Sequence, residues 1–267
     1  MKVKNSFYIF KKDWQEIYKN KEILLPIIIL PILFSIIFPI LLIGTALFIP
    51  PEEYNNGESL RDLIPFFQGQ ENEVLKIIIY YNINFLMKPL FLFTPMILTM
   101  VIASDSFAGE KERKTIESLL ILPITDKELI LGKVLTAFIP AIIATWAAFG
   151  AFQALIFFMT YDIIGFNLIG LDWYLLLFLF TPLLSFFSVI LMIINSSRAK
   201  DAKSAQNVAV IIILPVISLF FLQMTNLFVL NIINILILSA FIGLLDLLMI
   251  YLGGKQLNRD RLISRIR

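Results

Sequence analysis

Neither cysteine nor histidine occurs among the 267 residues, so the side chains that most often do chemistry are missing. A thiolate or imidazole metal site, a haem site, a disulfide and a histidine-based catalytic triad are therefore excluded. A phosphate-cradling loop is missing too, because Gly132-Lys133 and Gly253-Gly254-Lys255 lack the upstream glycine and the following hydroxyl of that motif. We expect no catalytic residue, no cofactor and no metal site, and we expect any ATP hydrolysis to occur on another chain.

The richest group of ionisable side chains is one run between two apolar stretches, at residues 105–133. Glu110 and Lys114 stand four residues apart there, as do Arg113 and Glu117, and such pairs stabilise a helix. The run predicts a stiff helical elbow of the kind that a cytoplasmic partner could push against. A bland connector is the alternative.

Start and stop signals divide this elbow into two short helices. Asp105 or Ser106 is expected to cap the first helix, which Pro123 ends. Thr125 and Glu128 form a capping box, which predicts that a second helix begins there and continues into the next apolar stretch.

Polar side chains inside the apolar stretches are few, and Asp246 is the only ionisable group well inside one of them. Ser239 shares its helix face, Ser185 and Ser188 form a similar stripe on another stretch, and Gln153 lies within a third. Such stripes mediate helix packing more often than they line a pathway, and both interpretations stay open. Because no basic partner is expected nearby, we predict that Asp246 bonds a serine or the backbone of a neighbouring helix.

The elements that position these side chains are membrane helices. Hydrophobic residues make up 59% of the chain and charged residues 16%, whereas soluble domains average roughly 45–50% and about 25%. A helix needs about 20 mainly apolar residues to cross the hydrocarbon, and barrel strands are shorter and alternate. The sequence therefore predicts an all-α membrane protein, with residues 1–267 forming one domain. Six stretches qualify as spans: 23–48, 85–103, 134–160, 173–194, 208–227 and 229–252.

Six spans put both ends of the chain on one side, and the basic residues indicate which side that is. Of the 22 lysine and arginine residues, 19 lie before the first span, after the last span, or in the second and fourth connecting loops. Only Arg61, Lys76 and Lys88 lie on the other side. We expect a multi-pass protein of the plasma membrane with both termini in the cytoplasm. Topology accounts for the basic residues, so nucleic-acid binding is not expected.

Two features outside the spans complete the predicted architecture. Residues 5–21 carry Phe7, Phe10, Trp14 and Ile17 on one face, which predicts an interfacial helix on the lipid membrane, with a solvated tail as the alternative. The last two predicted spans almost touch, so a tight turn near residues 226–231 must join them.

The elbow resembles the signature of ABC-2 type transporter permeases. That family carries a Gly-Glu-x-Glu-x-x-Thr-x-Glu-x-Leu-Leu run, then a proline, then Gly-Lys at the start of the third span. The tail, with Leu257 and Asp260 in place of Phe and Glu, is similar to the family's Phe-x-Arg-Glu-x-Leu ending. The elbow matches at Gly109, Glu110, Glu112, Thr115, Glu117, Leu119, Leu120, Pro123, Gly132 and Lys133.

The resemblance implies the permease subunit of an ATP-binding cassette exporter. Two permease subunits pair in such transporters, as a homodimer or a heterodimer, and each meets a separate ATPase subunit through a coupling helix between spans 2 and 3. Residues 105–133 would hold that coupling helix here. The resemblance puts five residues at the ATPase contact: Glu110, Glu112, Arg113, Thr115 and Glu117.

Two other functions stay open on the residues alone. An ion-coupled secondary transporter or channel would work without an ATPase and would use Asp246 as its ionisable group. A membrane scaffold would bind a cytoplasmic partner without moving any substrate.

Overall fold

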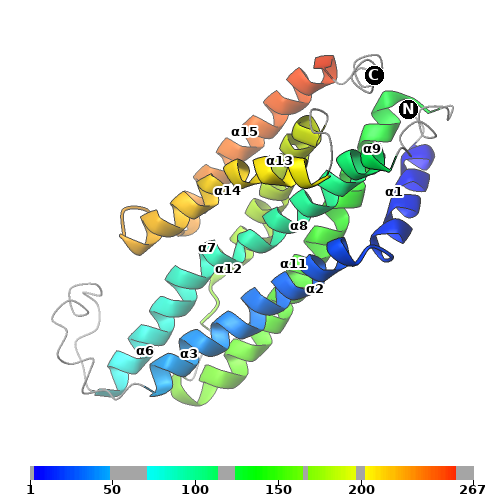
Figure 1. Cartoon of the computed structure of the whole chain (residues 1–267). Coiled ribbons are helices and arrows are strands. Elements are labelled where there is room, and N and C mark those ends of the chain that lie inside the picture. Colours follow the sequence, from blue (N-terminus) through cyan, green and yellow to red (C-terminus); the bar gives the residue numbers. More distant parts are fainter. Residues whose placement is uncertain (1–2, 49–70, 114–123, 165–167, 197–201, 257–267) are drawn as a thin grey trace.

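A computed structural model describes residues 3–48, 71–113, 124–164, 168–196 and 202–256, and every regular element among them is a helix (Figure 1). Six helical stretches are long and apolar enough to cross a membrane. The predicted all-α fold with six spans is therefore confirmed. The middle of the elbow, with Thr115 and Glu117, lies outside the described residues, and so does the tail after residue 256.

The observed spans differ from the predicted ones at their ends. The second span begins at Leu75, ten residues before the predicted start at residue 85. The fifth span ends before residue 227 and the sixth begins after residue 229, which leaves room for the turn between them. The spans are Lys21–Phe48, Leu75–Gly109, Lys127–Ile163, Leu171–Ser196, Ser204–Met224 and Ile232–Tyr251.

Each span is built from one or more labelled helices, with π-helical segments written η. Helix α1 (Val3–Ile17) precedes the first span, which comprises α2 (Lys21–Ile32), η1 (Leu33–Ile37) and α3 (Phe38–Phe48). The second span belongs to α6 (Glu71–Tyr81), η2 (Asn82–Leu86), α7 (Met87–Phe91), α8 (Phe93–Ser104) and η3 (Asp105–Gly109), followed by α9 (Glu110–Glu112). The rest are α11 (Asp126–Ile164), α12 (Leu171–Leu175), η4 (Leu176–Phe180), α13 (Thr181–Ser196), α14 (Ala202–Met224) and α15 (Ile232–Gln256).

The long helices run alongside one another, and the two ends of the bundle carry different elements (Figure 1). Helix α1, α9, the start of α11 and the end of α15 lie at one end, which we call the α1 end. The end of α3, the start of α6 and the turn between α14 and α15 lie towards the other, which we call the distal end.

Buried apolar side chains form two main clusters. The larger one joins α1, α8, α13 and α14, and the second fills the space between the distal parts of spans 1 to 4. Aromatic rings dominate the second cluster, where the Trp173 ring lies 5.0 Å from the Phe152 ring and 6.0 Å from the Phe91 ring, centroid to centroid. Aromatic pairs at these distances stabilise more than their buried area alone. Spans 2, 3 and 4 are therefore held together at their distal parts.

The turn between α14 and α15 is tight. Asn226 has a φ of 56°, in the left-handed region that asparagine adopts more readily than most residues. The Phe228 amide donates to the Leu222 carbonyl at 3.1 Å. The Asn231 side chain then caps α15 by accepting from the Asn234 amide at 2.9 Å. The turn predicted near residues 226–231 is confirmed.

The π-helical segments change how spans contact one another. A π turn bonds each amide to the carbonyl five residues back, as the Met87 amide does with the Asn82 carbonyl in η2. Three of the four described π segments also present a carbonyl to a side chain of another span. The pairs are Asn84 with Gln223, Ser106 with Lys133 and Leu177 with Trp146.

Candidate functional site

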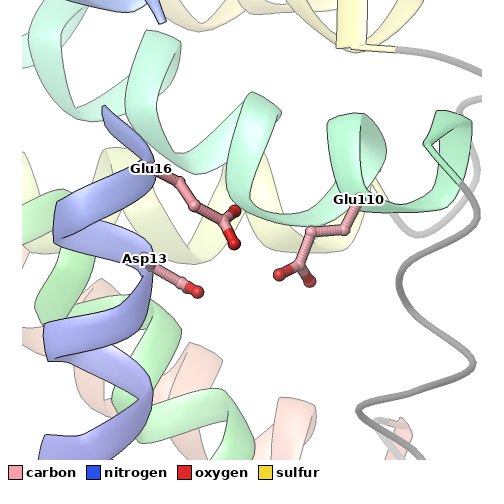
Figure 2. A group of neighbouring side chains, drawn as sticks. All are labelled: Asp13, Glu16 and Glu110. Carbon is pink, nitrogen blue, oxygen red and sulfur yellow. The ribbon is translucent and has the colours of Figure 1, made fainter. Parts of the chain in front are cut away.

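Charged side chains from three helices meet at the α1 end, in what we call the α1 charge cluster. Figure 2 shows the carboxylates of Asp13 and Glu16, from α1, and of Glu110, from α9, facing one another. The Lys12 ammonium lies 2.9 Å from Glu110, 3.3 Å from Glu16 and 3.5 Å from Asp13. Lys133 of α11 pairs with Glu110 and lies 3.7 Å from Asp13. Ion pairs thus join elements that are far apart in the sequence.

Lys133 lies at the centre of this cluster. Its side chain and that of Glu110 are each only 1% exposed. The ammonium also donates to the carbonyl of Ser106 and lies 5.0 Å from the centroid of the Phe107 ring. Removing an ion from water costs several kcal/mol, so a buried pair is stable only when further hydrogen bonds satisfy it. Ser106 supplies such bonds, because its hydroxyl also donates to Asp13 at 3.2 Å.

Gly132 allows α1 to lie against the start of α11. A Cβ at Gly132 would lie 2.8 Å from the Cβ of Ile9 and 2.9 Å from the carbonyl oxygen of Ser6, which is closer than atoms pack. The close approach also lets the Ser6 hydroxyl donate to the Glu128 carbonyl at 2.9 Å. Both residues of the Gly-Lys pair therefore position α1. Gly132 leaves space for its backbone, and Lys133 pairs with its Asp13 side chain.

Gly109 makes room for a second ion pair at the end of span 2. Arg113 donates to both carboxylate oxygens of Asp105, at 2.9 and 3.1 Å. A Cβ at Gly109 would lie 2.5 Å from the Asp105 carboxylate and 3.2 Å from the Arg113 guanidinium. This bidentate pair raises the pKa of Arg113, because the hydrogen bonds to Asp105 favour its charged form.

One of the two predicted helix caps in the elbow is confirmed and the other is wrong. The Thr125 amide donates to the Glu128 carboxylate at 3.2 Å, and the Glu128 amide donates to the Thr125 hydroxyl at 3.4 Å, which is a reciprocal capping box. Asp105 and Ser106 cap nothing, because the helix of span 2 continues through them as η3.

The α1 charge cluster does not suit a metal ion, although one oxygen from each of its three carboxylates lies within 4.8 Å of the others. Two ammonium groups already lie among these oxygens. Burial raises the pKa of Asp13, and the charge of Glu110 adds to this rise, while Lys133 and Lys12 oppose it. Burial is the largest single influence on the pKa of Lys12 and would lower it, but Glu110, Asp13 and Glu16 together raise that pKa above its usual value. Three carboxylates thus face two ammonium groups, and each ammonium pairs with more than one carboxylate.

The five residues assigned to ATPase docking fall into three groups. Glu110 is buried inside the α1 charge cluster, so a partner cannot touch it in this conformation. Glu112 and Arg113 are exposed at the described end of the elbow. Thr115 and Glu117 lie outside the described residues. The docking role of all five stays a prediction.

The polar residues inside the spans are mostly buried between helices. Ser185, Ser188 and Ser239 are buried, and the hydroxyls of Ser188 and Ser239 donate to carbonyls four residues earlier in their own helices. Gln153 is half-buried and donates to the Tyr174 hydroxyl at 3.0 Å.

The prediction that Asp246 bonds a serine or the backbone is wrong. Its side chain is buried at 4% exposure, and neither carboxylate oxygen has a hydrogen-bond partner among the described residues. Asp246 lies three residues after Gly243, whose nearest neighbour in another helix is the apolar side chain of Leu183. The burial of Asp246 is therefore not compensated by a hydrogen bond within the described part of the chain.

A second polar group, which we call the distal polar network, was missed by the sequence reasoning. It consists of Asn84, Lys88, Asp172, Trp173 and Gln223. Lys88 is buried and pairs with Asp172, and its ammonium also donates to a carbonyl in the α14–α15 turn. The charge count placed Lys88 outside the membrane, yet a lysine within an apolar stretch is itself a signal for a buried acidic partner.

The fold and these two sites define a polytopic helical membrane protein in which one charged elbow joins spans 2 and 3. A family model described as ABC-2 family transporter protein matches residues 7–252, which include all six spans, and the chain belongs to that family. It is therefore a permease subunit of an ABC transporter, a membrane component that works in general with an ABC ATPase. No curated protein and no solved structure matches the chain.

Proposed function

We propose that this chain is one half of the membrane domain of an exporter, paired with a second permease subunit and driven by a separate ATPase subunit. ATP binding and hydrolysis on that subunit displace the elbow, and the helix bundle shifts between two conformations. The α1 charge cluster carries this proposal, because it connects the base of the elbow rigidly to spans 2 and 3.

The cluster favours transmission of movement over simple connection. Glu110 follows the end of span 2 and Lys133 lies near the start of span 3, so their ion pair fixes both bases of the elbow to each other. Asp13 and Lys12 attach α1 to the same point. A force on the elbow would therefore move two spans and α1 together.

The exposed residues of the elbow are the ones that a partner can touch. We assign docking to Glu112 and Arg113, continuing into Thr115 and Glu117, and we assign Glu110 a positioning role because it is buried. The basic residues support a plasma-membrane protein with the α1 end in the cytoplasm, where the ATPase and its ATP are found.

Charge reversal in the elbow tests this function. The chain is co-expressed with a candidate ABC ATPase subunit from its own genome, and the complex is purified and reconstituted into lipid vesicles. Glu112→Lys is expected to lower both the recovery of the ATPase and its ATP turnover by about tenfold, as expected for loss of a charged contact at an interface.

Asp162→Lys is the matched control, because it makes the same reversal on an exposed residue near the distal end of α11. This control should keep full ATPase recovery and turnover. If both the single variant Glu112→Lys and the double variant Glu112→Lys/Glu117→Lys keep them as well, the elbow is not the docking site.

An ion-coupled secondary transporter is the second candidate, because the buried carboxylate of Asp246 has no hydrogen-bond partner among the described residues. That function predicts gradient-driven transport by the purified chain without any ATPase, abolished by Asp246→Asn. Under the proposed function, Asp246→Asn instead keeps ATP turnover by the complex. Gradient-driven transport by the purified chain that is lost in a folded Asp246→Asn variant would favour the second candidate, whereas transport only with the ATPase and ATP would exclude it.

A further inference from the structure

Lys88 connects three parts of the chain at the distal end. Its ammonium pairs with Asp172 at the start of α12 and donates to the carbonyl of Leu230, in the α14–α15 turn, at 3.2 Å. The lysine itself belongs to α7 in span 2. One side chain therefore joins span 2 to span 4 and to the turn between spans 5 and 6.

Asn84 repeats the same connections one turn earlier. Its side-chain amide donates to the Leu168 carbonyl, just before α12, at 3.4 Å, and its side-chain oxygen accepts from the Trp173 indole at 3.2 Å. Its backbone carbonyl, in the π segment η2, accepts from Gln223 of α14 at 3.3 Å. Two successive turns of span 2 thus bond to different residues around the start of span 4 and around the connection between spans 5 and 6.

Stability alone does not explain a lysine at this place. Lys88 is 3% exposed, and apolar side chains of similar volume often stabilise a protein as well as a buried ion pair does. Lys88 is the more buried partner of its pair, because the side chain of Asp172 is 22% exposed. Separating the pair is strongly unfavourable unless the Lys88 ammonium also reaches water. Such a pair gives a junction two distinct states, bonded and hydrated.

The position of Lys88 along span 2 suits a gate at the far membrane surface. Lys88 and Glu110 lie 22 residues apart in the sequence, which corresponds to about 33 Å of helix at roughly 1.5 Å per residue. The hydrocarbon core is about 30 Å thick. If the α1 charge cluster lies at one surface, Lys88 lies close to the other.

We propose that Lys88 is a latch that keeps the distal end of the bundle closed by holding Asp172 and the Leu230 carbonyl, and that it releases them when this end opens. The opening step rests on the proposed transport function. Lys88 is a positioning residue in this scheme, since it acts on helices and touches no substrate.

Cysteine labelling tests the latch, because the chain has no cysteine of its own. Leu177, in η4, is 1% exposed and belongs to the same buried cluster as Trp173, so Leu177→Cys reports opening of the distal end. The purified chain is placed in lipid nanodiscs without ATPase, and modification by a charged maleimide is timed. Lys88→Met is expected to speed modification of this reporter by about tenfold or more, because hydrogen bonds to a charged group are lost.

Two control reporters and one rescue make the result specific. Leu171→Cys, on an exposed residue at the start of α12, should react fast in every background, and Ala137→Cys, on a fully buried residue in α11, should stay protected. The exchange Lys88→Asp/Asp172→Lys should bring the L177C rate back towards the wild-type rate. An unchanged L177C rate in Lys88→Met overturns the latch. If Lys88→Met speeds modification of the A137C reporter as much as that of the L177C reporter, the latch is also overturned. Lys88 would then stabilise the whole fold and not the distal end alone.

The complete complex separates the latch from the exporter function. With the ATPase bound, addition of ATP should speed modification of the L177C reporter in an otherwise wild-type chain. If ATP is hydrolysed but never changes this rate, the latch is overturned and the exporter function stands. If Lys88→Met opens the distal end in nanodiscs but no ATPase binds the chain, the latch stands and the exporter function falls.

Discussion

Lys133 and Glu110 form a buried ion pair, so removing one charge leaves the other buried without its partner. Lys133→Met is expected to lower the free energy of unfolding by about 3 kcal/mol, the lower end of the usual range for breaking a buried pair. The loss stays at that end because Lys12 remains 2.9 Å from Glu110. Thermal unfolding of the purified protein measures this effect.

The exchange Glu110→Lys/Lys133→Glu is the control for that loss. It restores a pair of opposite charges and should recover part of the stability, whereas charge reversal at either position alone should not. A Lys133→Met protein that unfolds at the wild-type temperature would contradict a stabilising role for the pair.

Asp13 gives the α1 charge cluster an unusual dependence on pH. Burial raises its pKa in the folded state, so the folded protein binds a proton more tightly than the unfolded chain, whose aspartates titrate near 3.9. Between the unfolded and folded pKa values, this group therefore makes the protein less stable as the pH rises. The more common acid, with a lowered pKa, has the opposite effect.

Asp13→Asn should remove this contribution. The unfolding temperature of the variant, minus that of the wild type, is expected to rise as the pH is increased from about 4. Thermal scans at closely spaced pH values check it. A difference that falls with increasing pH would mean that Asp13 is stabilised as a carboxylate by Lys133 and Lys12.

In helix α1 the side that the amphipathic pattern marks as apolar is not the side that packs on the bundle. Phe7, Phe10, Trp14 and Tyr18 form a row of tilted and edge-on ring contacts on one side of α1, and Phe7 and Tyr18 are exposed. Ile17, which the spacing predicts on the same face as Phe7, Phe10 and Trp14, is instead buried. The side that packs on the bundle instead carries Ser6, Ile9, Asp13 and Ile17. Asp13 looks like a surface residue until its partner Lys133, 120 positions later in the chain, is known.

Packing of α1 depends on the missing side chain at Gly132. Gly132→Leu should push α1 away from α11 and cost about 1–3 kcal/mol, the usual effect of overpacking. Gly150→Leu is the matched control, because a Cβ there meets nothing within 4 Å.

A cysteine at Ile17, buried in α1, reports the displacement. Ile17→Cys should react with a thiol reagent faster in the Gly132→Leu background and at an unchanged rate in the Gly150→Leu background. Equal rates in both backgrounds would show that α1 tolerates a side chain at its contact with α11.

Hydropathy and helix signals predict the six spans and one helix cap. They do not predict the π-helical segments within the spans. The six spans and the capping box of Thr125 and Glu128 follow from local composition and spacing, which are present in a single stretch of sequence. Three of the four described π segments present a carbonyl to a partner from another span, such as the Asn84 carbonyl to Gln223, and such partners cannot be seen in a single stretch of sequence. The same holds for Lys88 and Asp172, which are 84 residues apart.

The orientation of the whole molecule is open to a direct test with exposed residues from opposite ends. Tyr18, after α1, is 59% exposed and Leu171, at the start of α12, is 63% exposed. The distribution of basic residues predicts that a membrane-impermeant thiol reagent added to intact cells modifies Leu171→Cys but not Tyr18→Cys.

Permeabilised cells provide the control, because both cysteines should then react. Modification of Tyr18→Cys alone in intact cells would show that the orientation is inverted. The elbow would then lie outside the cell, away from any cytoplasmic ATPase. Modification of both would indicate that the chain inserts in two orientations.

Span 2 reaches from Leu75 to Gly109, with Lys88 in its distal half and Glu110 directly after its end. Each residue of a helix turns the chain by about 100°. Inserting a single alanine between these two charges would therefore leave both ends folded but out of phase, so that only one could face its partners at a time. A rotation of span 2 about its own axis would therefore change the contacts of the α1 charge cluster and of Lys88 at the same time.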